Sequence, residues 1–422
     1  MKDSTLKITF EEFKLDNGLT VLLSEDKTIP SVAINICYKV GSKDEDPGKR
    51  GFAHLFEHLM YEGSKNVPNG AYDKYCLFAG GENNGYTNED KTNYFIVLPS
   101  HQLELGLWLE SDRMAAFSIS EESLEKQKQV VNEEKMQMYD NKPYGSLGLE
   151  FPPRLFKNGG YSWDTIGDMN DIGSASINDV KKFFENYYVP NNAVLSLTGD
   201  FDHNQAKEAI KKYFGDIKPG NTVRTFQSTG NFSTGEIRDV IYDNVQFPGV
   251  FMAYKIPEEN TNEQYAFEVL NEILSTGESS KFYKTLVYEK QLVSEIWSYI
   301  DAKEYAGVFY IFSILMPGVK NETVEDEINR IINDIKNNGI TEKELSKVKN
   351  KFETSYTFRL QSIINKADLL AHYKTFHGNA GLVNSIIQRF LNISLDDIHN
   401  NANEFLRDEN RVILNYLPKK NN

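Results

Sequence analysis

The pattern of apolar and polar positions changes its period several times along the 422-residue chain. Residues 8–40 carry runs typical of strands, FKLDNGLTVLL and SVAINICYKV, with Asn17-Gly18 predicted as a two-residue hairpin turn. Several later segments repeat apolar residues every three or four positions, which predicts amphipathic helices. The pattern therefore indicates an α+β protein with antiparallel-rich sheets and flanking helices.

The same order of elements starts again after the middle of the chain. The segment GVFMAYKIP resembles the earlier strand INICYKV, and EQYAFEVLNEILSTG resembles RGFAHLFEHLMYEG. A stretch rich in Gly, Ser and Thr, KPGNTVRTFQSTGNFSTGE, separates the two halves. We therefore predict an internal duplication with two homologous α/β-roll domains, residues 1–220 and 232–422.

The segment that follows Gly51 carries the most distinctive chemistry. Its apolar residues mark one helical face, and His54, Glu57 and His58 lie on the other side. Two histidines four apart project from one helical face, and the Glu57 carboxylate reaches over the same point. Such a set suits Zn²⁺, and a glutamate beside the metal can accept a proton from bound water. The order H-x-x-E-H is the inverzincin signature.

A third ligand is expected on a rigid element. The best candidate is the segment SISEESLEKQKQVVNEEKMQMYDN, in which Ser118 or Ser120 can cap a helix. The apolar stripe of this helix consists of Leu124, Val131 and Met138. Gln127 and Glu134 fall on this stripe, whereas Glu133 lies on the wetter side. A carboxylate on an apolar stripe is costly unless it is paired or binds metal. Glu134 is therefore the candidate ligand, with a salt-bridged boundary residue as the alternative.

These segments resemble the pitrilysin-type zinc peptidases, the family of insulin-degrading enzyme and the mitochondrial processing peptidase. The resemblance spans nearly the whole chain and is strongest in residues 15–140. It implies one zinc per chain, bound by His54, His58 and Glu134, with Glu57 as the general base. Glu134 follows His58 by 76 positions, which agrees with the family spacing. When EQYAFEVLNEILSTG is aligned with RGFAHLFEHLMYEG, the motif residues His54, Glu57 and His58 are replaced by Phe267, Leu270 and Asn271, so the second half has no zinc site.

The run GGENNGYTNEDKTNYF resembles the edge strand of that family, to which an extended substrate peptide adds by backbone pairing. Gly80 and Gly81 permit a sharp turn before it. By position, Asn84, Gly85 and Tyr86 would contact the substrate. An ordinary hairpin without a substrate role is the alternative.

Two departures from the family pattern bear on activity. Gln127 stands where the family commonly has an accessory glutamate, and its effect stays open. In single-chain members of the family, an arginine and a tyrosine hold the substrate. The matching positions of this chain are Val287 and Ser294, whose side chains cannot make those contacts. We therefore expect the catalytic subunit of a heterodimeric peptidase whose homologous non-zinc subunit supplies the pair. The alternatives are a self-sufficient homodimer and a non-catalytic scaffold.

Composition narrows the choice of partners. A formal net charge of −15 argues against nucleic acid and anionic membranes, and no apolar run is long enough to span a bilayer. Cys37 and Cys76, the only cysteines, suggest no disulfide framework. The first residues, MKDSTLKITFEEF, hold no apolar signal core, so we expect a cytoplasmic protein, or a periplasmic one if a leader has been removed. Five histidines outside the motif are predicted to be structural or at the surface: His101, His203, His372, His377 and His399.

Overall fold

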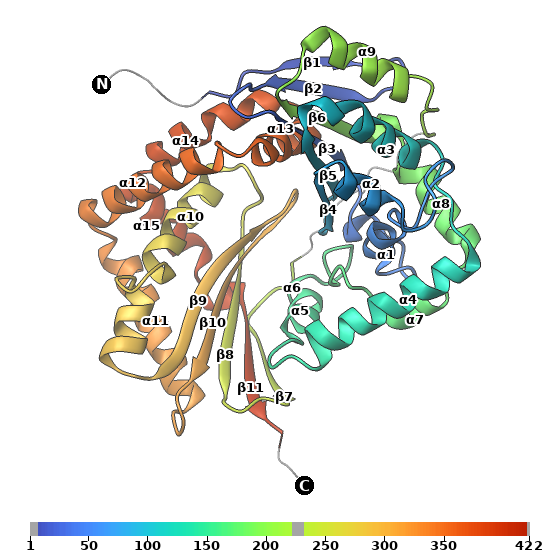
Figure 1. Ribbon diagram of the computed structural model, residues 1–422. Coiled ribbons are helices and arrows are strands. Elements are labelled where there is room, and N and C mark those ends of the chain that lie inside the picture. Colours follow the sequence, from blue (N-terminus) through green and yellow to red (C-terminus); the bar gives the residue numbers. More distant parts are fainter. Residues whose placement is uncertain (1–6, 222–231, 420–422) are drawn as a thin grey trace. The chain divides into compact units, whose positions relative to one another are not determined.

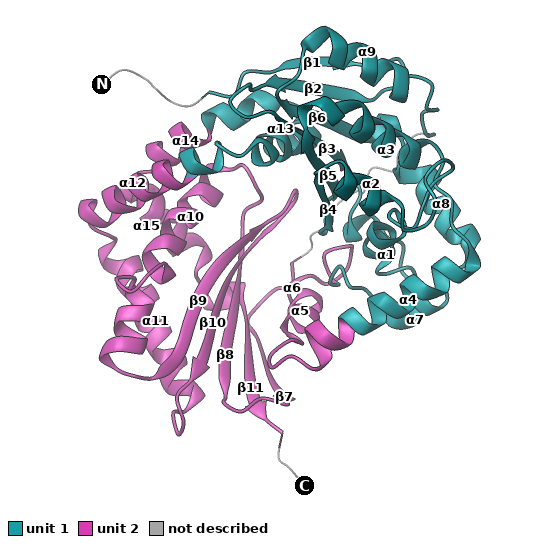
Figure 2. Cartoon of the chain, in the orientation of Figure 1, with its two compact units in different colours: residues 1–134, 163–227, 356–385 teal, residues 135–162, 228–355, 386–422 magenta. Residues whose placement is uncertain are grey.

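The structure is a computed structural model that describes residues 7–221 and 232–419 (Figure 1). The predicted linker and the N-terminal segment lie partly outside these ranges. The chain forms two compact units (Figure 2): unit 1 holds residues 1–134, 163–227 and 356–385, and unit 2 holds the rest. The predicted bounds of the two homologous halves, 1–220 and 232–422, stay a prediction, and the compact units do not follow these bounds, because 135–162 joins unit 2 and 356–385 joins unit 1.

Unit 1 contains a six-stranded sheet in the order β1-β2-β6-β3-β5-β4. Its strands are β1 Glu11–Lys14, β2 Thr20–Glu25, β3 Ser31–Tyr38, β4 Glu82–Thr87, β5 Thr92–Pro99 and β6 Ala193–Gly199. The β2 and β6 strands pair in parallel, and the other neighbours are antiparallel. Every residue of β6 is buried, as expected for a strand inside a sheet that is covered on both faces.

The predicted two-residue turn between the first strands is wrong. The amide of Leu15 donates to the carbonyl of Leu19 at 2.9 Å, which leaves a three-residue loop between them. Gly18 has φ of +92°, the left-handed conformation that ends such a loop with a bulge. The Asn-Gly pair did locate the turn, but the number of loop residues was set by the closing backbone hydrogen bond.

The helices of unit 1 are α1 Phe52–Leu59, α2 Tyr72–Phe78, α3 Leu103–Ala115, α4 Glu121–Lys135, α7 Met169–Gly173, α8 Ile177–Tyr187, α9 His203–Phe214 and α13 Ile363–His377. Among them, α1, α2, α3 and α13 pack against strands of the sheet. Although α13 is distant in sequence, it packs against β3 and β6, with Ile363 and Ala367 on Ala33. Asp368 of α13 accepts hydrogen bonds from Lys91 at 3.2 Å and from Tyr86 at 2.6 Å. These contacts fix α13 as part of unit 1.

Unit 2 contains a five-stranded sheet in the order β7-β11-β8-β10-β9. Its strands are β7 Ile237–Asp243, β8 Gly249–Ile256, β9 Val293–Ala302, β10 Gly307–Leu315 and β11 Arg411–Pro418. One face forms an apolar core with α5 Leu147–Glu150, α6 Pro152–Leu155 and the residues that follow them. Phe151, which joins the two short helices, lies with its ring 5.3 Å from that of Tyr310. Segment 135–162 therefore belongs to unit 2 because its aromatic side chains complete this core.

The longer helices of unit 2 cover the other face of its sheet. They are α10 Asn262–Ser275, α11 Asn321–Asn338, α12 Glu342–Arg359, α14 Ile386–Asn392 and α15 Leu395–Phe405. The α10 helix packs against β9, and α11 and α15 pack against β8. Within the described ranges, no helix combines the length and the apolar character needed to cross a bilayer.

The two sheets share one topology, which confirms the predicted duplication. In each sheet a parallel pair, β2 with β6 or β7 with β11, is followed by two antiparallel strands and an antiparallel edge strand. By this correspondence β8 matches β3, as the sequence similarity of the two strands predicts. The edge strand β9 of unit 2 is then the counterpart of β4 in unit 1.

Candidate metal and peptidase site

Three side chains of unit 1 converge on one point. The Nε2 atoms of His54 and His58 lie 3.3 Å apart, and Oε2 of Glu134 lies 3.5 Å from the first and 3.4 Å from the second. Both histidines lie on α1, and Glu134 lies in the last turn of α4. The structure thus brings together the three residues that the sequence nominated as metal ligands.

The spacing of these atoms fits a single zinc ion. Ligand atoms about 2.0–2.1 Å from a tetrahedral zinc lie about 3.3–3.4 Å from one another. The three atoms form a triangle with sides of 3.3, 3.4 and 3.5 Å, which matches one face of that tetrahedron. Two imidazoles and a carboxylate are also the donor types that zinc takes in catalytic sites, where the fourth position stays open.

The electrostatics of His54 and Glu134 favour the forms that bind a cation. Burial and the neighbouring His58 lower the pKa of His54 to about 4, so its ring is neutral at pH 7. A hydrogen bond from His58, together with the nearby His54, lowers the pKa of Glu134 and keeps it ionised. Metal binding requires neutral imidazole and ionised carboxylate, so the site is prepared for it.

The folding of α1 follows from its apolar face. Phe52, Leu55, Phe56 and Leu59 are all at most 1% exposed, and the three polar residues of the motif are only partly buried. The helix therefore presents its polar side to the site because its other side is in the core.

The stripe predicted for α4 is only partly correct. Leu124, Gln127 and Val131 are buried, and Ser120 Oγ caps the helix by accepting from the Ser123 amide at 3.1 Å. Met138 is 51% exposed, because the helix continues as a π-helical turn from Met136 to Asp140 that rotates it out of register. Glu134 precedes this turn and keeps its place on the stripe.

Glu57 lies beside the edge strand of the unit 1 sheet. Burial raises its pKa, and hydrogen bonding with Thr87 acts in the opposite direction. Thr87 ends β4, the edge strand on which the sequence placed Asn84, Gly85 and Tyr86. Asn84 is exposed, whereas the Tyr86 hydroxyl is engaged with α13. The general-base candidate and the candidate substrate strand are thus adjacent.

Sequence reasoning missed Glu45, which anchors α1, the helix that carries His54 and His58. Its buried carboxylate accepts from the amides of Gly51 at 2.9 Å and Ala53 at 2.8 Å, and from the Trp163 indole at 3.0 Å. Gly51 is the N-cap of α1 and has no side chain to satisfy these donors. Burial raises the pKa of Glu45 to about 8, although these hydrogen bonds favour its charged form. The signal, an acid seven residues before the first residue of the helix, was too weak to find without the fold.

The structure also gives Gln127 a partner. Its Nε2 donates to Oε1 of Glu62 at 2.5 Å, and Asn69 donates to the other carboxylate oxygen. Lys126 lies 3.4 Å from Glu62. Burial alone would raise the pKa of Glu62, but these donors outweigh it and lower the pKa. An amide at position 127 therefore matches an acid at position 62, four residues after His58.

In unit 2, the positions aligned with the motif have a different environment. Phe267 and Leu270 are at most 1% exposed in α10, and Asn271 accepts a hydrogen bond from Ser298. Val287 lies in the π-helical segment Tyr283–Glu289, and the Ser294 hydroxyl donates to the carbonyl of Ile314 at 3.2 Å. Neither side chain replaces the arginine or the tyrosine that single-chain members of the family carry at these positions.

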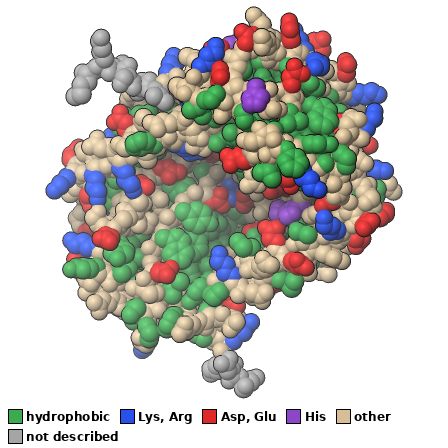
Figure 3. Space-filling view, viewed as in Figure 1, with side chains coloured by type: hydrophobic (Ala, Val, Ile, Leu, Met, Phe, Trp, Pro, Cys, Tyr) green, Lys and Arg blue, Asp and Glu red, His purple; other side chains and the backbone are tan. Residues whose placement is uncertain are grey.

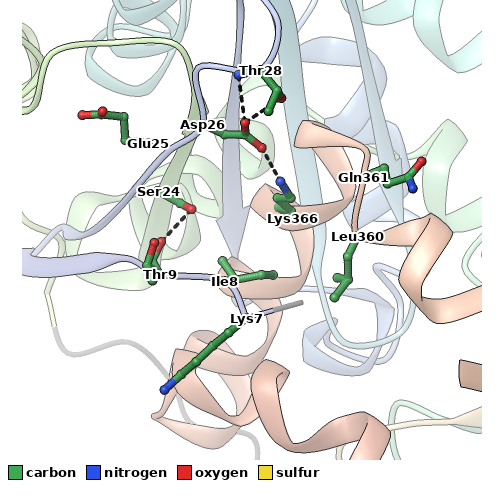
Figure 4. Close-up of a pocket in the computed structure, with 10 residues that line it drawn as sticks. All are labelled: Lys7, Ile8, Thr9, Ser24, Glu25, Asp26, Thr28, Leu360, Gln361 and Lys366. Carbon is green, nitrogen blue, oxygen red and sulfur yellow. Dashed lines mark hydrogen bonds and ion pairs between the residues drawn. The ribbon is translucent and has the colours of Figure 1, made fainter. Parts of the chain in front are cut away.

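Other clusters of unit 1 are separate from this site. The rings of His372 and His377 lie 6.1 Å apart on α13. Figure 4 shows a cavity of about 460 Å³ in which Asp26 accepts from Lys366 and from Thr28. These bonds lower the pKa of Asp26 to about 2 against the effect of burial. Because the Asp26–Lys366 pair joins β2 to α13, we assign it a structural role.

Comparison with known proteins agrees with the geometry. Residues 20–156 match the insulinase family, peptidase family M16, and residues 174–352 match the peptidase M16 inactive domain. The chain is 32% identical over 403 residues to the zinc protease PqqE of Helicobacter pylori, covering 94% of this chain and 90% of that protein. It is 22% identical over 405 residues to the uncharacterized zinc protease YmxG of Bacillus subtilis, covering 96% and 97% of the two chains.

A solved structure extends the similarity to the whole fold. The crystal structure of a protease from Helicobacter pylori superposes with a TM-score of 0.92 at 30% sequence identity, covering 97% of this chain and 100% of that one. Both halves of the sequence and the fold therefore match one family, and the chain belongs to peptidase family M16, the insulinase or pitrilysin-type zinc proteases.

Proposed function

We propose that this chain is a zinc-dependent endopeptidase in which His54, His58 and Glu134 bind one zinc ion and Glu57 is the general base. The observation that carries the proposal is the triangle of ligand atoms, with sides of 3.3 to 3.5 Å, beside Glu57, a partly buried glutamate on the helix of the two histidines. Family membership agrees with it, since relatives are named zinc proteases.

Each residue of the site has a chemical role in peptide hydrolysis. When bound, zinc would supply Lewis-acid activation of a water molecule and polarisation of the scissile carbonyl. The Glu57 carboxylate accepts a proton from the attacking water and then returns it to the leaving amide nitrogen. A peptide added to the free edge of β4, along Asn84, Gly85 and Tyr86, would be held extended next to Glu57.

Substitution of Glu57 separates the base from the ligands. Glu57→Gln should keep about one zinc per chain, because none of the three ligands changes, and should abolish peptide cleavage. Metal analysis and a fluorogenic peptide assay on the same preparation measure both. Cleavage at the wild-type rate by this variant would exclude Glu57 as the base.

We further propose that the active form is a heterodimer. The argument rests on Val287 and Ser294, which provide neither a cationic nor a phenolic group where single-chain relatives clasp the substrate. A homologous subunit without a zinc site would supply the missing arginine and tyrosine. One donor to a developing oxyanion is worth on the order of 10²–10³ in rate, so the isolated chain should cleave peptides poorly.

The test compares this chain alone, a candidate homologous subunit alone and their mixture. Strong activity in the mixture only would support the split site. Full activity of the isolated chain would favour the self-sufficient homodimer, and zinc binding without activity in any combination would favour a non-catalytic scaffold.

A further inference from the structure

The candidate substrate strand β4 lacks the features that normally fix the register of a strand. None of its six residues is buried, and among the described strands it pairs only with β5. Its sequence, ENNGYT, contains two asparagines and a glycine, which are depleted in strands. Register is strongly specified where one face of a strand is buried, and weakly specified in polar strands that contain glycine. The position of β4 along β5 therefore needs another restraint.

Asp368 of α13 provides such a restraint near the end of the strand. Its Oδ1 atom accepts hydrogen bonds from the Tyr86 hydroxyl at 2.6 Å and from the Lys91 ammonium at 3.2 Å. Tyr86 is the last residue but one of β4, and Lys91 directly precedes β5. One carboxylate oxygen thus holds both sides of the hairpin, and it comes from a helix that packs on β3 and β6 in the middle of the same sheet. We call Asp368, Tyr86 and Lys91 the β4 clamp.

The β4 clamp differs from the ion pairs of the surface. Charged side chains of both signs are spread over the face of the molecule in Figure 3, and exposed pairs contribute little to stability. Lys91, in contrast, is 5% exposed, and its ammonium lies 5.0 Å from the centre of the Tyr86 ring. Burial would raise the pKa of Asp368, but the charge of Lys91 and the hydrogen bond from Tyr86 outweigh it and lower this pKa. An ionised carboxylate is therefore held by a buried ammonium and a phenol.

A slip of one residue would break the clamp. Successive side chains of a strand point to opposite faces, so a shift of β4 by one position would turn Tyr86 away from Asp368. Gly85 or Thr87 would take its place, and neither carries a group that reaches as far as a phenol hydroxyl. In the observed register Thr87 lies opposite Thr92 of β5. The bond from Tyr86 to Asp368 therefore selects this register over its neighbours.

The register of β4 matters because the strand ends beside the candidate general base. Burial raises the pKa of Glu57, and hydrogen bonding with Thr87, the residue after Tyr86, opposes this rise. A slip would remove that contact and would move each backbone group of the free edge by about 3.3 Å along the strand. A displacement of about 1 Å at a reacting group can cost about 10²-fold in rate. The clamp thus acts where it can place both the base and a peptide paired with the edge.

We propose that Asp368 is a positioning residue for peptide cleavage, which sets the register of β4 through Tyr86 and Lys91. By this means it holds Thr87, and a peptide added to the strand, beside Glu57. The consequence for cleavage rests on the proposed peptidase function, whereas the setting of the register does not.

Hydrogen exchange tests the clamp without turnover. In the full zinc-loaded chain, Asp368→Ala and Tyr86→Phe should each speed exchange of the β4 amides about tenfold or more, because each removes a hydrogen bond to a charged group. Asp26→Ala is the matched control, because it removes the partner of Lys366 on the same helix, at the contact with β2. Its effect on β4 should stay within about twofold.

Cleavage and rescue separate positioning from loss of stability. Zinc should stay at about one per chain in Asp368→Ala, whereas kcat should fall about tenfold or more with a smaller change in KM, for this chain alone and in the mixture with a candidate homologous subunit. Asp368→Asn keeps an acceptor for Tyr86 but leaves the buried Lys91 without its counter-charge, so it should also be impaired. Adding Lys91→Gln removes that charge and should restore most of the β4 protection and of kcat.

The proposal is overturned if β4 exchanges in Asp368→Ala as it does in Asp26→Ala, or if both variants lower kcat by the same factor. It is also overturned if Lys91→Gln fails to rescue Asp368→Asn in the exchange measurement. Failure of the proposed function is a separate result. If the wild type cleaves no peptide in any combination while Asp368→Ala still speeds exchange of β4, the peptidase is refuted and the register clamp stands.

Discussion

The pair formed by Gln127 and Glu62 offers a sharp test of how α4, which carries Glu134, is held against the segment that follows α1. Gln127→Glu restores the residue that the family commonly carries, but here it replaces an amide donor with a second carboxylate 2.5 Å from a buried acid. We expect this change to destabilise the docking of α4 instead of improving the site. Because Glu134 lies two turns further along α4, zinc affinity should fall as well.

The size of the effect is bounded from both sides. Loss of a hydrogen bond to a charged group costs about 1.5–3 kcal/mol. The introduced carboxyl can escape repulsion by taking up a proton, and holding that proton at pH 7 against an unfolded pKa of about 4.3 costs at most about 3.7 kcal/mol. The expected destabilisation at pH 7 is therefore about 1.5–3.7 kcal/mol.

The sign of the pH dependence follows from the same argument. Repulsion raises the pKa of the introduced carboxyl in the folded state above its unfolded value. Below its unfolded-state pKa the introduced carboxyl is protonated in both states and does not lower the free energy of unfolding. Stability is lost as the pH rises from the unfolded-state pKa to the folded-state pKa. The difference from the wild type should be smallest near pH 4 and grow by up to about 1.4 kcal/mol per pH unit.

Hydrogen exchange of peptides from α4, measured by mass spectrometry from pH 5 to 8, reports the local opening free energy. Gln129→Glu is the matched control, because it adds the same charge at an exposed position of the same helix. Combining Gln127→Glu with Glu62→Gln should restore protection, since amide and acid exchange places. If Gln127→Glu matches the Gln129→Glu control at every pH, or the double variant is not rescued, the assignment of the pair is wrong.

Three further changes test other parts of the site. Glu134→Gln should lose zinc on metal analysis while Glu133→Gln retains it, and equal loss in both would reject the choice of ligand. Glu45→Ala removes the acceptor of the Gly51 and Ala53 amides at the start of α1 and should lower the local stability of this helix by about 1–3 kcal/mol, read by amide exchange of α1. Gly51→Ala, with φ of +92° and a neighbouring side-chain atom 2.7 Å from the new Cβ, should lower the thermal midpoint more than Gly48→Ala, whose Cβ meets nothing within 4 Å.

Periodicity determined the local elements and the core of the site. The four-residue spacing of His54 and His58 fixes their common helical face, and the stripe through Leu124 and Val131 placed Glu134 without knowledge of the fold. Similar strand and helix segments in the two halves predicted the duplication, which the sheet orders confirm. These features were accessible because the repeat of a helix or strand acts on neighbouring residues of one sequence segment.

Only the tertiary structure decided which distant segments meet. It placed α13 on the unit 1 sheet and residues 135–162 on the unit 2 sheet, and it paired Glu62 with Gln127. It also left the large aromatic side chains of Trp297 and Tyr299 exposed on β9, which by sequence alone is an ordinary strand. The physical reason is that burial and hydrogen bonding between residues far apart depend on the path of the whole chain, whereas periodicity records only which way each side chain points from its own element.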